Sequence, residues 1–138
     1  DEYEVFSLSY TRKVLERVTG VPRILFTKGG KPWLAAMMRS GCEAVGIDWN
    51  TDPREARQLA AGRVALQGNL DPSALFASPD QVRAAARKVI DSFGVEPGHV
   101  FNLGHGILPG TPVESVAALV DEVRTYSRKL KEKARAGP

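Results

Sequence analysis

Four short apolar stretches, separated by segments with helical periodicity, constrain the fold of this chain more than any other feature. The stretches are Arg23–Thr27, Ala44–Asp48, Val64–Gln67 and His99–Leu103. Because they are almost continuously apolar rather than alternating, they are typical of β-strands that are buried on both faces. Strands that alternate with helices pair in parallel through right-handed crossovers. The sequence therefore predicts an α/β fold with four parallel strands and flanking helices.

Helical patterns precede the first strand and follow each of the four strands. The clearest helix begins at Ser78, which stands at a cap position before a proline, and its apolar stripe continues to Phe93. Another helix is expected to begin with a cap at Thr111, and shorter helices are expected at Pro32–Arg39 and Pro53–Ala60. This order of elements fits either a small open sheet or half of an eight-unit (β/α)8 barrel, and periodicity does not choose between them.

Composition excludes several classes of partner. The formal net charge of +3 arises from a basic run at Arg124–Arg135, which is typical of a solvated helix end, so no nucleic-acid surface is predicted. No apolar run approaches the roughly 20 residues of a membrane span, so no membrane contact is predicted. The single cysteine, Cys42, excludes an internal disulfide and a CxxC metal site and is interpreted as a small core residue. A lone thiol also fits a reducing compartment.

Polar residues gather where the four strands end, which is the edge at which parallel α/β sheets bind ligands. His105 is the strongest candidate, because flanking glycines leave its imidazole accessible and its charge changes near neutral pH. It can bind a carboxylate or pass a proton, and the alternative is a loop histidine bonded to backbone. Lys28 can meet an anion or simply be solvated. Asp48 can act as an acid or ligand, or cap the following turn.

The remaining candidates at this edge are Gln67, Asn69 and Asn102, and the first two are more typical of turn scaffolds than of catalytic groups. His99 opens its strand at the opposite end and is predicted to be structural. The sequence contains neither a P-loop nor a GxGxxG pattern, and it contains no HxH, HxC or HExxH. We therefore predict neither a nucleotide nor a metal.

Two segments carry a more specific signal. Val64–Pro72 reads VALQGNLDP and Asn102–Pro112 reads NLGHGILPGTP, and together they resemble the uroporphyrinogen decarboxylase family. Gly46–Trp49 and Ile24–Lys28 resemble the preceding strands of that family, so the resemblance spans essentially the whole chain. It implies a (β/α)8 barrel, usually a homodimer, that decarboxylates the four acetate side chains of uroporphyrinogen to give coproporphyrinogen in haem or chlorophyll biosynthesis. It also implies that no metal or organic cofactor takes part, and that the protein is cytoplasmic or in the plastid stroma.

The resemblance carries over one functional residue, His105, as a substrate-binding histidine. The arginine loop, the catalytic Asp and the substrate-binding Tyr and Ser of the family have no counterpart in this sequence, so no catalytic residue is assigned. We therefore predict that residues 1–138 form a single incomplete TIM-barrel domain, the last four β/α units, which is inactive alone. Its partner would be the missing N-terminal half or a second copy.

Two other functions stay open from the sequence. One is a corrinoid-linked methyltransferase on a related barrel. Such enzymes typically place a zinc-binding HxC at the strand that corresponds to Ile24–Thr27, whereas this sequence reads ILFTKGG there, so zinc analysis would discriminate and no zinc is expected. The other is a non-enzymatic half-barrel that serves as an assembly module.

Overall fold

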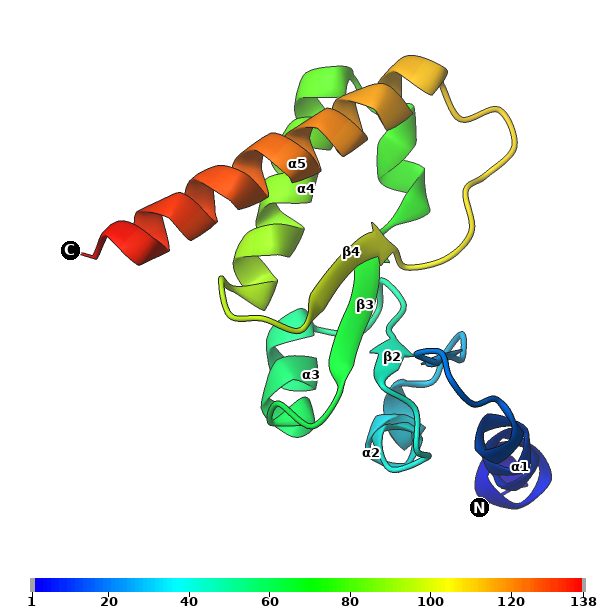
Figure 1. Cartoon of the computed structure of the whole chain (residues 1–138). Helices are drawn as coiled ribbons and strands as arrows, with labels where there is room; N and C mark the ends of the chain where they lie inside the picture. The colour runs from blue at the N-terminus through cyan, green and yellow to red at the C-terminus, as the bar shows by residue number, and fades with distance from the viewer. Residues whose placement is uncertain (1, 138) are drawn as a thin grey trace.

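The computed structural model describes residues 2–137 and contains one parallel sheet in the order β1-β2-β3-β4 (Figure 1). The strands are β1 (Ile24–Phe26), β2 (Ala44–Gly46), β3 (Ala65–Leu70) and β4 (His99–Leu103). Each strand pairs with the next one in the sequence, so the sheet winds in one direction and does not reverse as a doubly wound sheet does. The predicted parallel α/β fold is confirmed, and the winding is that of a barrel. Residues 1 and 138, the two ends of the predicted domain, lie outside the described residues.

Helices precede the sheet and follow every strand, as predicted. They are η1 (Glu4–Leu8, a π-helical turn) and α1 (Ser9–Arg17), then η2 (Lys31–Trp33) and α2 (Leu34–Met38), α3 (Pro53–Ala60), η3 (Pro72–Phe76) and α4 (Pro79–Phe93), and α5 (Val113–Ala136). Within residues 2–137 none of them is both long and apolar enough to cross a membrane.

The two long helices begin differently. The predicted capping box of α4 is present, since the backbone N–H of Ser78 donates to Gln81 Oε1 over 3.1 Å. The predicted cap of α5 is wrong, because the Thr111 hydroxyl donates to the carbonyl of Leu108 over 2.7 Å instead. Helix α5 then starts one residue after Pro112, without a side-chain cap.

The helices that follow the strands cover one face of the sheet and form two apolar clusters with it. The first joins β2 and β3 to α2 and α3, and its central members are Met37, Val45, Ala56 and Leu66. The second joins the end of β3 to η3, α4 and α5 through Leu70, Leu75, Val82, Ala86 and Leu119. Burial of these side chains holds the strands in place from one side.

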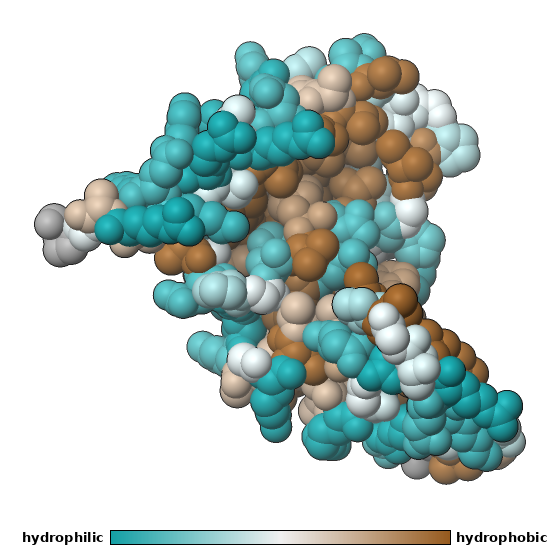
Figure 2. Space-filling view, in the orientation of Figure 1, coloured by the Kyte–Doolittle hydropathy of each residue, from teal (hydrophilic) through white to brown (hydrophobic). Residues whose placement is uncertain are grey.

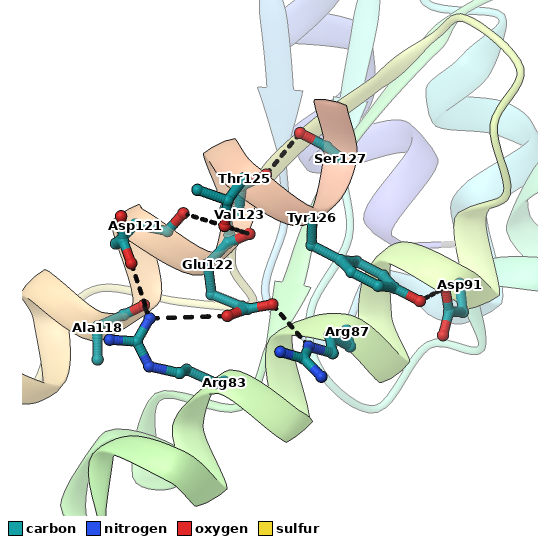
Figure 3. Close-up of polar contacts among 10 residues, drawn as sticks. All are labelled: Arg83, Arg87, Asp91, Ala118, Asp121, Glu122, Val123, Thr125, Tyr126 and Ser127. Carbon is teal, nitrogen blue, oxygen red and sulfur yellow. Dashed lines mark hydrogen bonds and ion pairs between the residues drawn. The ribbon is translucent and has the colours of Figure 1, made fainter. Parts of the chain in front are cut away.

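Polar contacts reinforce the pairing of α4 with α5 (Figure 3). The buried carboxylate of Glu122 accepts from Arg87 Nε over 2.6 Å, and Arg83 Nη1 lies 3.6 Å from its other oxygen. The bond from Arg87 lowers the pKa of Glu122 below its usual value. One turn further on, the Tyr126 hydroxyl donates to Asp91 over 2.9 Å. These contacts fix the last helix of the sector against its predecessor.

The opposite face of the sheet is open, which corrects the prediction that all four strands are buried on both faces. Strand β2 is buried throughout, but β1 and β4 alternate. Ile24, Phe26 and Val100 are 49%, 42% and 45% exposed. Figure 2 shows brown apolar surface across the middle of the molecule, between the teal flank of α5 and the N-terminal helix.

Strand β3 is longer than predicted, because it continues to Leu70 rather than ending at Gln67. The extra residues Asn69 and Leu70 pair with Asn102 and Leu103 of β4. Their strand conformation depends on this non-local pairing, which the local pattern around Gly68 does not indicate.

Candidate functional site

A hollow of about 420 Å³ lies on the open face of the sheet, at the carboxyl ends of the strands. Its walls are formed by Phe26, Gly46, Ile47, Gln67, Asn102, Leu103, His105, Gly106 and Ile107. Three of the six predicted site residues, Gln67, Asn102 and His105, therefore line one cavity. These three side chains bring polar and ionisable groups to the cavity, and the apolar side chains among its walls form its floor.

Strand register explains why these side chains meet. Phe26, Gly46, Gln67 and Val100 are partners across the four strands, so they occupy one layer of the sheet. Paired residues of parallel strands point to the same face. At Gly46 a Cβ atom would lie 2.9 Å from Phe26 Cδ2, so the phenyl ring occupies the space that a side chain on β2 would need. The small residue thus makes room for the floor of the hollow.

His105 stands between two aromatic rings. Its imidazole lies 6.1 Å from the ring of Phe26 and 6.2 Å from that of Trp49, in an edge-on arrangement with an interplanar angle of 89° in the second case. The side chain remains exposed. Lys28 lies beside the same indole, with its Nζ 5.7 Å from the centre of the Trp49 ring. We call the group of His105, Trp49 and Lys28 the corner of the hollow. Imidazole and ammonium groups around an indole form a corner suited to an aromatic ligand that carries carboxylates.

Asp48 and Asn69 lie beneath this corner rather than in the wall of the hollow. Asp48 is 3% exposed, and its carboxylate accepts from the N–H of Gly29 over 2.7 Å and from the N–H of Asn50 and the hydroxyl of Thr51 over 3.1 Å each. Asn69 Nδ2 donates to the carbonyls of Asp48 and Thr51 over 2.8 and 2.7 Å. The predicted capping role of Asp48 is thus present, with an additional bond to the loop after β1.

His99 is placed at the other end of β4, where it packs as a structural residue. Its ring stacks on Phe93 with centroids 3.6 Å apart, and Nε2 donates to the carbonyl of Gly68 over 2.9 Å. Burial lowers the pKa of His99 and outweighs the bond to Gly68, which raises it. Cys42 is buried in the first apolar cluster, as predicted.

Sequence reasoning missed Phe26 and Ile107 in the walls of the hollow and the Trp49 ring beside His105. A signal for Phe26 was present, since it precedes Thr27 on a strand whose alternate residues must face the inside of a barrel. The position of Trp49 depends on the packing of Gly104 against the Asp48–Trp49 backbone, which no local pattern indicates. Among residues 2–137 no three His, Cys, Asp or Glu side chains gather closely enough to hold a metal ion.

The fold and site together define a sector of a (β/α)8 barrel with a ligand-binding edge at the carboxyl ends of its strands. Residues 1–126 match the family model described as uroporphyrinogen decarboxylase (URO-D). The chain belongs to the uroporphyrinogen decarboxylase family, and the resemblance inferred from the two loop segments is confirmed.

Curated relatives support this assignment. The chain is 52% identical to uroporphyrinogen decarboxylase of Ralstonia pickettii (strain 12J), over 97% of this chain and 39% of the relative. It is 54% identical to that of Burkholderia mallei (strain SAVP1), over 96% of this chain and 38% of the relative. The chain therefore spans about two fifths of the length of these proteins.

A solved structure supports the fold alone. A methyltransferase from Methanosarcina mazei superposes with a TM-score of 0.78 at 24% identity, over 91% of this chain and 37% of that chain. This neighbour is TIM-barrel-like, so four parallel strands with flanking helices again correspond to part of a barrel. Its low identity carries no inference about chemistry.

Proposed function

We propose that this chain supplies one wall of the active site of a uroporphyrinogen decarboxylase. The observation that carries the proposal is the hollow at the strand ends, where His105 stands between Phe26 and Trp49. In its protonated form the imidazole would pair with a carboxylate of the substrate, while the aromatic rings contact a pyrrole ring. Gln67 and Asn102 would hydrogen-bond polar substituents across the floor.

The partner in this proposal is the remainder of the barrel. Two strand edges, one on β1 and one on β4, have no partner strand within residues 2–137. The outer face of the N-terminal helix is also apolar, with Phe6 74% exposed and Tyr10 and Val14 on the same face. Open parallel edges beside exposed apolar surface are rarely stable in water. Further β/α units that continue the winding would cover all three surfaces.

The test of this proposal is complementation. Residues 1–138 are coexpressed with the N-terminal portion of the Ralstonia pickettii enzyme, and coproporphyrinogen formation from uroporphyrinogen is measured beside light scattering of each preparation. We expect activity from the complex and none from the chain alone. His105→Ala should raise KM about 10- to 100-fold, the value of one hydrogen bond to a charged group.

Several outcomes would count against the proposal. Full activity of the chain alone would contradict the need for a partner, as would a stable, cooperatively melting monomer. A complex that assembles but does not turn over would favour the assembly module. The methyltransferase alternative is disfavoured because the segment Ile24–Gly30 contains neither His nor Cys, and stoichiometric zinc in the purified chain would revive it.

A further inference from the structure

We infer that Asp48 is a positioning residue of this site. It holds the turn at residues 27–30, called the Lys28 turn below, in a fixed position relative to Trp49. The inference rests on the proposed function, because it concerns the corner where that substrate would bind. Asp48 does not reach the hollow itself. Asp48 acts through the loops after β1 and β2, which carry Lys28 and Trp49.

The bonds to Asp48 join residues next to the corner. Oδ2 accepts from the N–H of Gly29, the neighbour of Lys28, over 2.7 Å. Oδ1 accepts from the N–H of Asn50, the neighbour of Trp49, over 3.1 Å. One rigid carboxylate therefore spans the loops after β1 and β2. Gly29 has a φ of +70°, a conformation that only glycine adopts easily, and its turn is also closed by the bond from the N–H of Gly30 to the carbonyl of Thr27 over 3.0 Å.

The network continues to the end of β3 and to the residue after β4. Asn69 donates to the carbonyls of Asp48 and Thr51, and the N–H of Gly104 donates to the carbonyl of Leu70 over 2.7 Å. Gly104 immediately precedes His105. Hydrogen bonds to the carboxylate and to the backbone carbonyl of Asp48 thereby connect β1, β2 and β3, and the bond from Gly104 adds the end of β4. The Gly29 bond attaches the Lys28 turn to this network.

The chemistry of this position requires a carboxylate rather than an amide. Both oxygens of Asp48 accept from donors, and none of the ion pairs among residues 2–137 involves this residue. Asparagine would turn one NH2 group toward an N–H. When that group faces Gly29, the bond from Gly29 is lost. When it faces Asn50, the Thr51 hydroxyl can rotate to accept from it, and the bond from Gly29 persists without its charge assistance. In either orientation Asp48→Asn should therefore weaken or remove the bond that holds the Lys28 turn.

The experiment uses the complemented protein with residues 1–138 labelled with ¹⁵N. Amide exchange of Gly29 is measured by NMR, and KM and kcat are measured with uroporphyrinogen. The matched control is Thr51→Val, which removes a different bond to the same carboxylate from an equally buried residue. In Asp48→Asn we expect Gly29 exchange to accelerate about 5- to 100-fold, from the loss of charge assistance alone to the loss of the whole bond. KM should rise severalfold while kcat changes little, since the corner contributes to binding rather than to the chemical step.

Thr51→Val should leave Gly29 exchange and KM near the wild-type values. Equal effects of the two variants on both quantities would reduce Asp48 to a general stabilising residue and overturn the inference. An unprotected Gly29 amide in the wild-type protein would also overturn it, whether or not Asp48→Asn folds. The exchange measurement needs no turnover, so an inactive complex would refute the proposed function without affecting this result.

Discussion

Replacing Gly104 with alanine should break the contact that holds the end of β4 against the loop after β2. The new Cβ atom would collide with the backbone nitrogen of Trp49 and would lie 3.0 Å from the carbonyl carbon of Asp48. These are backbone atoms, so no rotation of a side chain relieves the overlap. The bond from Gly104 N–H to the carbonyl of Leu70, 2.7 Å long, would be lost as the strand moves away.

The expected cost follows from these two contacts. Overpacking of a closely packed site costs about 1–3 kcal/mol, and a lost hydrogen bond costs about 1 kcal/mol. We therefore expect Gly104→Ala to lower the free energy of unfolding by about 2–4 kcal/mol. His105 follows directly in the chain, so KM for uroporphyrinogen should rise as well.

Gly106→Ala provides the control, because a Cβ at Gly106 would meet nothing within 4 Å. Both substitutions reduce the entropy of the unfolded chain by a similar amount, worth about 0.4–1 kcal/mol, so this contribution cancels in their difference. The assay is urea unfolding of the complemented protein. A difference below about 1 kcal/mol, the lower bound of the overpacking cost, would refute the reasoning from backbone contact.

Two further predictions concern pH. Burial lowers the pKa of His99 below 6.5, so the unfolded chain takes up this proton first and the free energy of unfolding should fall as pH decreases through 6.5. His99→Gln should flatten that slope in urea titrations between about pH 7.5 and 5.5, a window around the usual histidine pKa, and an unchanged slope would contradict the assignment. Hydrogen bonds from Arg23 lower the pKa of Glu43 from 4.5 to about 2, so any stability from this pair is present above pH 4.5 and lost as pH falls toward 2. NMR titration of the Glu43 carboxyl should show this pKa and its return toward 4.5 in Arg23→Gln, whereas wild-type titration near 4.5 would rule out the contact.

The parts of this structure that the sequence predicts well are those fixed by local physics. Continuous apolar runs identify the four strands, and the capping box at Ser78 identifies the start of α4. Prediction fails where the deciding contact is distant. The extension of β3 to Leu70 depends on pairing with β4, and the exposure of Val100 depends on which strands lie beside it.

The same distinction applies to the site. His105 could be selected from its loop and its flanking glycines, because accessibility is a local property. Whether Asp48 faces the ligand or the framework depends on Gly29, which is 19 residues away, and on a hydrogen bond that no spacing rule indicates. A polar residue at a strand end therefore has two possible roles that the sequence does not distinguish. The structure separates them by burial, since His105 is exposed and Asp48 is buried.

Under the proposed function this wall binds the substrate but does not turn it over, and the composition of the hollow is consistent with that proposal. Decarboxylation by the route that the family implies passes through a protonated pyrrole, and that cation needs an anion beside it. Two unit charges 4 Å apart attract by about 4 kcal/mol at an effective dielectric constant of about 20, which is worth about a thousandfold in rate. Among the described residues that line the hollow there is no carboxylate, and the nearby Asp48 is committed to three donors. Under the proposed function the stabilising charge would come from the units that complete the barrel, so adding those units should raise the rate by at least this factor, and His105→Ala should still act on KM.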